Sequence, residues 1–312
     1  MIRNLICLAA TGLALMFCPG IAHADTPAQG FTFNDTPGDH LDVLLDGKLA
    51  ARFMYAHDTS SKERRLETYK PYLHVYDAEG KSPITKGPGG EYTHHRGIFI
   101  GWMKVTFDGQ KYDTWHMPNS DIITRKIVET KGGPDEGSFT AQIDWVTNKG
   151  VTIIDEHRTM TFHRGPAPAR LTIDFTSNLK AAAGDLTLDG DPEHAGVQFR
   201  PANEVDRKKT LYFFPVEHPV PHKDLDYPWV GETFTLNGKQ YSVVDINSPE
   251  NPKGTRFSTY RDYGRFGAFP KTDVKSGQTL VLKYRFIVAD GPMLPAEFIE
   301  KSADQFTGAT TP

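Results

Sequence analysis

The fold of this chain is decided by residues 139–163, FTAQIDWVTNKGVTIIDEHRTMTFH. Two strand-like runs, Phe139–Thr147 and Val151–Phe162, flank Asn148-Lys149-Gly150, which has the composition of a turn. Side chains alternate between the two faces of a strand, and neither face of the second run is purely apolar. We therefore predict two strands joined by a tight turn, with polar groups among the aliphatic ones.

Turn signals and short alternating runs continue on both sides of this segment. Asp46-Gly47, Asp108-Gly109 and Asn237-Gly238 each separate two such runs, which is typical of a hairpin. Helical periodicity is clear only in Pro295–Phe306, where the proline suits a first helical turn. The pattern predicts an all-β protein: a large antiparallel β-sandwich with one short C-terminal helix.

The first residues are typical of a secretory signal. Arg3 supplies a positive charge, residues 5–17 form a short apolar run, and Ala22-His23-Ala24 is a cleavage site of the A-x-A type. We expect residues 1–24 to be a signal peptide and residues 25–312 to form a single β-sandwich domain. The protein would then be periplasmic or secreted. Lipidation at Cys18 is disfavoured, because the preceding residue is a bulky phenylalanine.

Composition excludes several classes of protein. The 312 residues include 35 basic and 39 acidic side chains, with no basic stripe that would indicate nucleic acid or an anionic lipid surface. No apolar run is long enough to span a membrane. Both cysteines, Cys7 and Cys18, fall inside the predicted signal, which excludes a disulfide scaffold and a thiol nucleophile. Phosphate-loop and serine-hydrolase motifs are also absent.

The strongest chemical signal is the segment Thr93-His94-His95-Arg96-Gly97. It follows a glycine-rich stretch, Gly87–Gly90, and leads into the apolar run Ile98–Trp102. Adjacent side chains of an extended segment point to opposite faces, so we expect at most one of the two histidines to face a ligand. An ordinary histidine pKa of roughly 6.5 suits proton transfer near neutral pH. We predict His94 or His95 as the general acid or base.

Glu156 and Arg158 lie two residues apart on one face of the predicted strand Val151–Phe162. One interpretation places them on the floor of a groove that binds polyol hydroxyls, with Glu156 as the complementary catalytic carboxylate. The other is a structural ion pair, which is common and individually worth little on a surface. The two interpretations are evenly balanced at this level.

Further histidines are His116, next to Trp115, and also His157 and His194. Three converging imidazoles could hold a divalent metal, since imidazole suits zinc, copper and iron. No spacing such as H-x-H or H-E-x-x-H fixes a metal site, and a structural histidine is the default. We therefore assign no metal ligand and no cofactor from the sequence, and keep a divalent metal as an alternative.

Arginines and tryptophans complete the candidate binding set. Arg200 has a planar donor fork suited to a carboxylate or to vicinal hydroxyls, and it could equally pair with Glu204 or Asp206. Trp115 and Trp229 stand beside polar clusters and could stack on a sugar ring, although core packing is the default. The residues predicted to bind substrate are Arg96, Trp115, His116, His157, His194, Arg200 and Trp229.

Three blocks resemble the PmoA-like family of exported bacterial proteins: KPYLH (70–74), YTHHRGIFIGW (92–102) and YRFIVADG (284–291). The resemblance covers about Phe31–Gly291 and implies an all-β protein of poorly defined activity, common in bacteria that degrade glycans. The "methane oxygenase" label of that family conflicts with the lack of membrane spans and of a copper motif. The resemblance also implies a galactose-mutarotase-like supersandwich, similar in outline to aldose epimerases, although His-His-Arg-Gly replaces their His-Gly-Phe segment.

These residues predict an exported carbohydrate-active enzyme that acts on a small carbohydrate or glycan by histidine and carboxylate acid–base chemistry. Epimerisation, elimination and glycoside cleavage all fit. A non-catalytic glycan-binding module is the first alternative, and a histidine-ligated metal protein is the weaker one. Nothing in the sequence indicates the oligomeric state.

Overall fold

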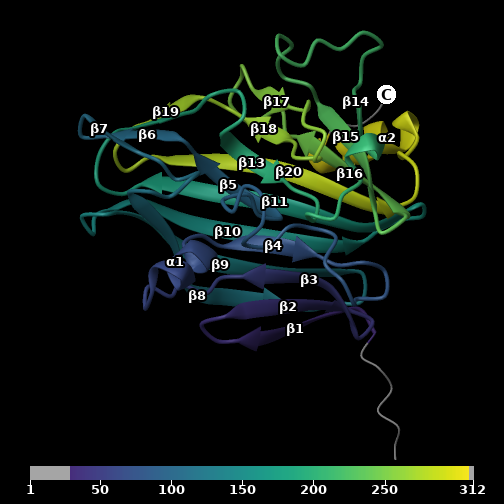
Figure 1. The fold of residues 1–312 in the computed structure, drawn as a ribbon, viewed down its shortest axis with the longest axis horizontal. Coiled ribbons are helices and arrows are strands. Elements are labelled where there is room, and N and C mark those ends of the chain that lie inside the picture. The colour runs from purple at the N-terminus through teal and green to yellow at the C-terminus, as the bar shows by residue number, and fades with distance from the viewer. Residues whose placement is uncertain (1–28, 309–312) are drawn as a thin grey trace, which may run out of the picture.

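The computed structural model describes residues 29–308, and its two large antiparallel sheets pack face to face (Figure 1). The six-stranded sheet has the order β1 (Phe31–Thr36), β2 (His40–Leu45), β3 (Lys48–Met54), β4 (Tyr72–Val75), β5 (Ile98–Trp102), β13 (Ala195–Phe199). The eight-stranded sheet has the order β14 (Leu211–Phe213), β15 (Trp229–Leu236), β16 (Lys239–Asn247), β20 (Thr279–Asp290), β11 (Ala169–Ala181), β10 (Thr152–Arg164), β9 (Glu136–Thr147), β8 (Ser120–Lys131). The predicted antiparallel β-sandwich is confirmed.

Smaller elements surround the two sheets. A four-stranded sheet has the order β19 (Thr272–Val274), β12 (Leu186–Asp189), β6 (Lys104–Phe107), β7 (Gln110–Tyr112). A two-stranded sheet pairs β17 (Arg256–Ser258) with β18 (Gly267–Phe269). The helices are α1 (Lys62–Thr68), α2 (Ala296–Thr307) and a 3₁₀ turn at Arg207–Lys209. Within residues 29–308, no helix is both long and apolar enough to cross a membrane. The predicted signal peptide lies outside the described residues, and the single-domain assignment stays a prediction.

The three dipeptide turns form where the sequence places them. Asp46-Gly47 joins β2 to β3, Asp108-Gly109 joins β6 to β7, and Asn237-Gly238 joins β15 to β16. All six residues have positive φ, between 47° and 81°. This geometry matches the right-handed twist of the flanking strands, and Asp, Asn and Gly adopt it at the lowest steric cost.

The main core lies between the two sheets, and the segment that decides the fold supplies one wall of it. Trp145 of β9 meets Trp102 of β5 across the sandwich, with ring centroids 5.8 Å apart. On β10 the side chains of Glu156, Arg158 and Met160 point into this core, and His157 points outward. The Glu156–Arg158 pair is thus inside the sandwich, where only a fully satisfied ion pair is tolerated.

Helix α2 covers the outer face of the eight-stranded sheet. Ile299 packs there with Trp229, Val244 and Ile246 in a second apolar cluster. Pro295 precedes the helix, and Gly308 ends it in the left-handed conformation. The predicted C-terminal helix is confirmed within about a residue at each end.

The outer face of the six-stranded sheet carries the third apolar cluster, in which Trp115 packs on Phe99 of β5 and Tyr72 of β4. Trp115 belongs to the connection between β7 and β8, so a loop covers this part of the face. Helix α1 lies next to it, where Glu67 and Thr68 line a pocket with Tyr72. Strand β5 begins only at Ile98. His94 and His95 therefore lie in the preceding turn, where the His95 amide donates to the Tyr92 carbonyl over 2.9 Å. The prediction that these two histidines alternate as in a strand is wrong.

Candidate metal centre

Three histidines from separate loops converge above the outer face of the six-stranded sheet. His94 precedes β5, His116 follows β7, and His194 precedes β13. Each offers a ring nitrogen, and the three nitrogens lie within 4.8 Å of one another. The ring centroid of His116 is 4.4 Å from that of His94 and 4.9 Å from that of His194. The sequence alone left open whether three histidines converge, and in the structure His94, His116 and His194 do.

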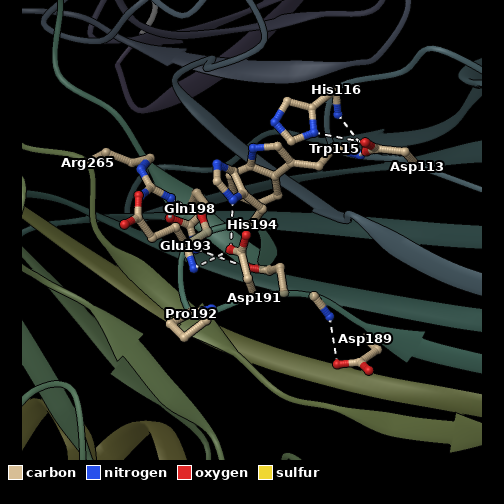
Figure 2. A network of polar contacts seen from close by, with 12 residues as sticks. Asp113, Trp115, His116, Asp189, Asp191, Pro192, Glu193, His194, Gln198 and Arg265 are labelled. Atoms are coloured by element: carbon tan, nitrogen blue, oxygen red, sulfur yellow. Dashed lines mark hydrogen bonds and ion pairs between the residues drawn. The ribbon is translucent and has the colours of Figure 1, made fainter.

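Two of the three imidazoles are oriented by carboxylates three residues earlier in the chain. His116 Nδ1 lies 2.8 Å from Asp113 Oδ2, and His194 Nδ1 lies 2.7 Å from Asp191 Oδ1 (Figure 2). A proton held on Nδ1 by a carboxylate leaves the Nε2 lone pair free for a metal ion. In many protein metal centres, a carboxylate accepts a hydrogen bond from one ring nitrogen of a histidine whose other ring nitrogen binds the metal.

The same carboxylates shape the loops that carry the histidines. Asp113 Oδ1 accepts the amides of Trp115 and His116 at 2.9 and 2.8 Å. Asp191 Oδ1 accepts the Glu193 amide at 2.9 Å. Aspartate favours such turns because its side chain bonds the backbone a few residues ahead. Each Asp-x-x-His unit is therefore a local turn that presents an oriented imidazole.

Close backbone approach holds these turns against the sheet. A Cβ atom on Gly101 of β5 would lie 2.4 Å from the Thr114 carbonyl oxygen. The Thr114 hydroxyl accepts the Trp102 amide at 2.9 Å, and the Met103 amide donates to the His194 carbonyl at 2.9 Å. Glycine at 101 lets the turn that carries His116 sit directly on the strand.

Burial keeps the cluster in the form that a metal requires. Desolvation, helped by the nearby charge of Lys70, lowers the pKa of His94 to about 2. Desolvation also lowers the pKa of His194, although Asp191 opposes the shift. Burial by itself would raise the pKa of Asp113, but its hydrogen bonds to His116 outweigh burial and lower it. Burial thus favours the neutral form of His94 and His194, while hydrogen bonds to the histidines favour the ionised form of Asp113 and Asp191.

Three converging imidazole nitrogens fit a divalent transition-metal ion. Zinc–nitrogen bonds of about 2.0–2.1 Å require the ligand nitrogens to stand roughly 3.3 Å apart. The three rings would need only a small inward shift to reach that spacing. Three protein ligands leave a coordination position for water or substrate, which is the arrangement of catalytic rather than structural zinc sites.

His95 lies next to this cluster, on the same side as His94. Its ring centroid is 4.4 Å from His94, 5.2 Å from Tyr92 and 5.9 Å from Tyr263. Only 1% of His95 is exposed, and neither ring nitrogen has a hydrogen-bond partner among the described residues. Burial, followed by the charge of Arg265, lowers its pKa well below the usual range. A neutral imidazole here has one donor and one acceptor free for a ligand.

Buried cations surround the histidines. Arg200 lies over the Tyr263 ring at 4.7 Å, and Arg265 lies 5.9 Å from the Trp115 ring centroid. Lys70 Nζ is 3.9 Å from the Phe99 centroid and donates to the Trp115 carbonyl over 2.7 Å. The guanidinium of Arg96 is next to Tyr69 and donates to the Leu66 carbonyl over 2.8 Å. The loops before β5, after β7 and before β13, together with the residues packed on them, form what we call the loop layer. It contains His94 and His95 and five of the residues predicted to bind substrate: Arg96, Trp115, His116, His194 and Arg200.

Three of the predicted site residues lie elsewhere. Both Glu156 oxygens are occupied inside the sandwich by Arg158, Trp145 and Ser177, at 2.7–2.8 Å. His157 is half exposed on the outer face of the eight-stranded sheet, and Trp229 packs under α2. The expected pairing of His94 or His95 with Glu156 does not form, because strand alternation turns Glu156 into the core.

Sequence reasoning missed several groups of the centre: Lys70, Asp113, Asp191, Tyr263 and Arg265. Asp113-x-x-His116 and Asp191-x-x-His194 share one spacing, and this repeated pattern was the available signal. Lys70, Tyr263 and Arg265 had no comparable signal, since only the packing of their loops brings them to the histidines.

Residues 40–304 match the profile of one sequence family, described as "Family of unknown function (DUF6807)". That description carries no PmoA label, so the resemblance to the PmoA-like family stays a prediction. A search of curated proteins finds no match.

A search of solved structures finds matches of low similarity. They include a β-arabinopyranosidase (10% identity, TM-score 0.39, 78% of this chain and 39% of the other covered). A putative aldose 1-epimerase from Klebsiella pneumoniae is 10% identical, with a TM-score of 0.38 and coverage of 89% and 92%. A galactose mutarotase-like protein from Lactobacillus casei is 9% identical, with a TM-score of 0.32 and coverage of 84% and 100%. This chain spans 39% and 32% of the first two structures compared, the second being a putative kojibiose phosphorylase.

Proposed function

The chain belongs to DUF6807, a family of unknown function, and from that premise we propose that it is a metal-dependent enzyme acting on a carbohydrate. The observation that carries the proposal is the convergence of His94, His116 and His194, two of them oriented by carboxylates. We propose these three residues as ligands of a divalent ion such as zinc. This replaces the acid–base role first expected for His94 and the substrate-binding role expected for His116 and His194.

The neighbouring residues support chemistry on a polar ligand. A divalent ion polarises a carbonyl or hydroxyl oxygen and lowers the pKa of bound water. The neutral His95 ring can exchange hydrogen bonds with a substrate hydroxyl, and Arg200 and Arg265 can hold developing negative charge. The proposed reaction is epimerisation, elimination or glycoside cleavage. Epimerisation and elimination next to a carbonyl are helped by polarising that carbonyl. In glycoside cleavage the ring becomes oxocarbenium-like while negative charge develops on the departing oxygen.

A carbohydrate fits the composition of the loop layer. Tyr92 is exposed and supplies a ring face next to His95, while imidazole and guanidinium groups supply hydrogen bonds. Aromatic faces combined with a few polar groups suit molecules that have both C–H and O–H surfaces. The predicted export and the resemblance to proteins of glycan-degrading bacteria support the same class of substrate.

The metal is tested by elemental analysis of the full chain purified without added metal, followed by titration with zinc. We expect about one tightly bound divalent ion in the wild type and none in H94A, H116A or H194A. His157→Ala is the matched control, because this histidine is half exposed and belongs to another sheet. Equal zinc affinity in the wild type and all three ligand variants would reject the centre.

Catalysis is tested separately, by product analysis of the metal-loaded protein on a panel of glycosides and free sugars. We expect a new sugar species that is not formed by H116A. A protein that binds both metal and glycan but forms no product would instead be the glycan-binding module, with the metal as part of its recognition site.

A further inference from the structure

We infer that the substrate of this centre is a sugar that carries an oxyanion, either a carboxylate or a phosphate. The inference rests on the proposed function, whose site it describes further. It follows from three features of the loops around the histidines. Arg200 is buried without a carboxylate partner, buried N–H donors lack acceptors, and the nearby acidic groups are bonded to other residues or uncharged.

Arg200 is a buried cation near the histidines. It is 1% exposed and donates to the carbonyls of Pro201 and Tyr263 at 2.9 and 2.5 Å. It has no carboxylate within ion-pair distance among the described residues. Lys70 is also buried, but burial lowers its pKa well below the usual range, so it is not counted as a positive charge. A buried charge without a counter-charge is costly, because it has lost its hydration. An anion that binds next to Arg200 would compensate part of that loss.

Several donors in the same layer point at no acceptor. Trp115 Nε1, Arg200 Nε and Arg265 Nε are buried and have no hydrogen-bond partner within residues 29–308. An indole and a guanidinium can only donate, so an acceptor must satisfy them. Buried donors are nearly always paired in folded proteins. The missing partner is therefore rich in acceptor oxygens.

The acidic side chains nearby cannot serve as that partner. Asp113 and Asp191 bond the two histidines, and Glu193 pairs with Arg261 and Arg265. Glu232 is the carboxyl beside Arg200, and both of its oxygens are buried without partners. Burial raises the pKa of Glu232 well above its usual range, more than the charge of Arg200 lowers it. An uncharged Glu232 leaves the positive charge of Arg200 uncompensated.

The aromatic rings connect these cations to the metal ligands. Arg200 lies over Tyr263, whose ring is 5.9 Å from His95, and the Trp115 ring lies 5.7 Å from His194. In the inferred complex, the sugar hydroxyls meet the metal and the oxyanion meets Arg200. Guanidinium forks match carboxylate and phosphate equally well, so the two sources share one chemistry and are separated by experiment.

The test is calorimetric titration of the zinc-loaded full chain with D-glucuronate, D-glucose 6-phosphate and D-glucose. We expect one of the two anionic sugars to bind at least tenfold more tightly than glucose, and the tighter one identifies the oxyanion. R200Q should lose at least tenfold of this preference, whereas R200K, which keeps the charge, should lose less. Arg207→Gln is the matched control, because Arg207 lies 5.6 Å from the same Tyr263 ring but is exposed and paired with Glu91.

The inference is overturned if glucose binds as tightly as both anionic sugars. It is also overturned if R200Q leaves the anionic preference intact in a folded protein. A thermal unfolding curve of each variant establishes folding. If neither anionic sugar binds the zinc-loaded protein, the inference is overturned as well. Zinc content is measured on the same samples, so failure of the metal centre is seen separately from failure of the charge preference.

Discussion

His116 and Asp113 are joined by a 2.8 Å hydrogen bond between ring Nδ1 and carboxylate Oδ2, and the second carboxylate oxygen bonds the amides of Trp115 and His116. A single side chain thus sets the shape of the turn and the orientation of the imidazole. Asp191 does the same for His194 at 2.7 Å. The centre is therefore preorganised by short-range contacts, and only its assembly depends on distant parts of the chain.

Asp113→Asn should weaken zinc binding by about 10–100-fold, the usual effect of losing such a partner of a metal-bound histidine. The amide can keep the bonds to the backbone, but its NH₂ group faces His116 Nδ1 and favours the tautomer with the proton on Nε2. Competition with a chromophoric chelator measures the affinity. Asp189→Asn is the control: this carboxylate ends β12, just before the turn that carries His194, and pairs with Lys271, so the affinity should not change.

Gly101→Ala should weaken zinc binding and lower stability by about 1–3 kcal/mol, the range for overpacking. Its Cβ atom would lie 2.4 Å from the Thr114 carbonyl and push away the turn that carries His116. Gly109→Ala is the control, since its Cβ would meet open space and only its positive φ of 68° is strained. We expect the control to lose some stability and no zinc affinity. Equal zinc affinity in both variants would contradict this account of the turn.

Glu156→Leu should destabilise the protein by about 3–5 kcal/mol, because it leaves Arg158 buried without its counter-charge. The double variant Glu156→Leu/Arg158→Met should recover most of this loss, and urea unfolding measures both. Zinc affinity should change less than twofold in the double variant. A folded, stable double variant that binds zinc but has lost all turnover would restore the catalytic role expected for Glu156 from the sequence.

The metal-free protein should lose stability between about pH 6.5 and pH 4, in part through His74. Burial, followed by the charges of Arg52 and Arg96, lowers the pKa of His74 to about 4. The unfolded state, with a pKa of roughly 6.5, binds the proton first, so acidification through this window favours unfolding. The shift corresponds to about 3 kcal/mol at most. His74→Gln should flatten the pH dependence of the unfolding free energy, whereas His157→Gln, at an exposed position, should not. Parallel curves for wild type and His74→Gln would disprove the assignment.

Much of the fold could be predicted because it depends on short-range patterns. Strands β9 and β10, the three dipeptide hairpins and helix α2 follow from side-chain alternation, positive-φ turn residues and helical periodicity. These features act over two to about ten residues, and the same residues decide them in any context. The faces were harder to assign. Glu156 and Arg158 are polar, yet they point into the core, where their mutual ion pair offsets part of the cost of burial.

By itself, the sequence determined the antiparallel strands, the C-terminal helix and the two Asp-x-x-His turns, because each results from contacts between near neighbours in the chain. Only the tertiary structure decided that His94, His116 and His194 meet. They lie on three loops that come together because β5 pairs with β13 and Gly101 admits the turn of His116. The tertiary structure also placed His94 and His95 in a turn rather than a strand, which puts both rings on one side. Proximity between distant loops is a property of strand pairing and packing, which the spacing of residues does not encode.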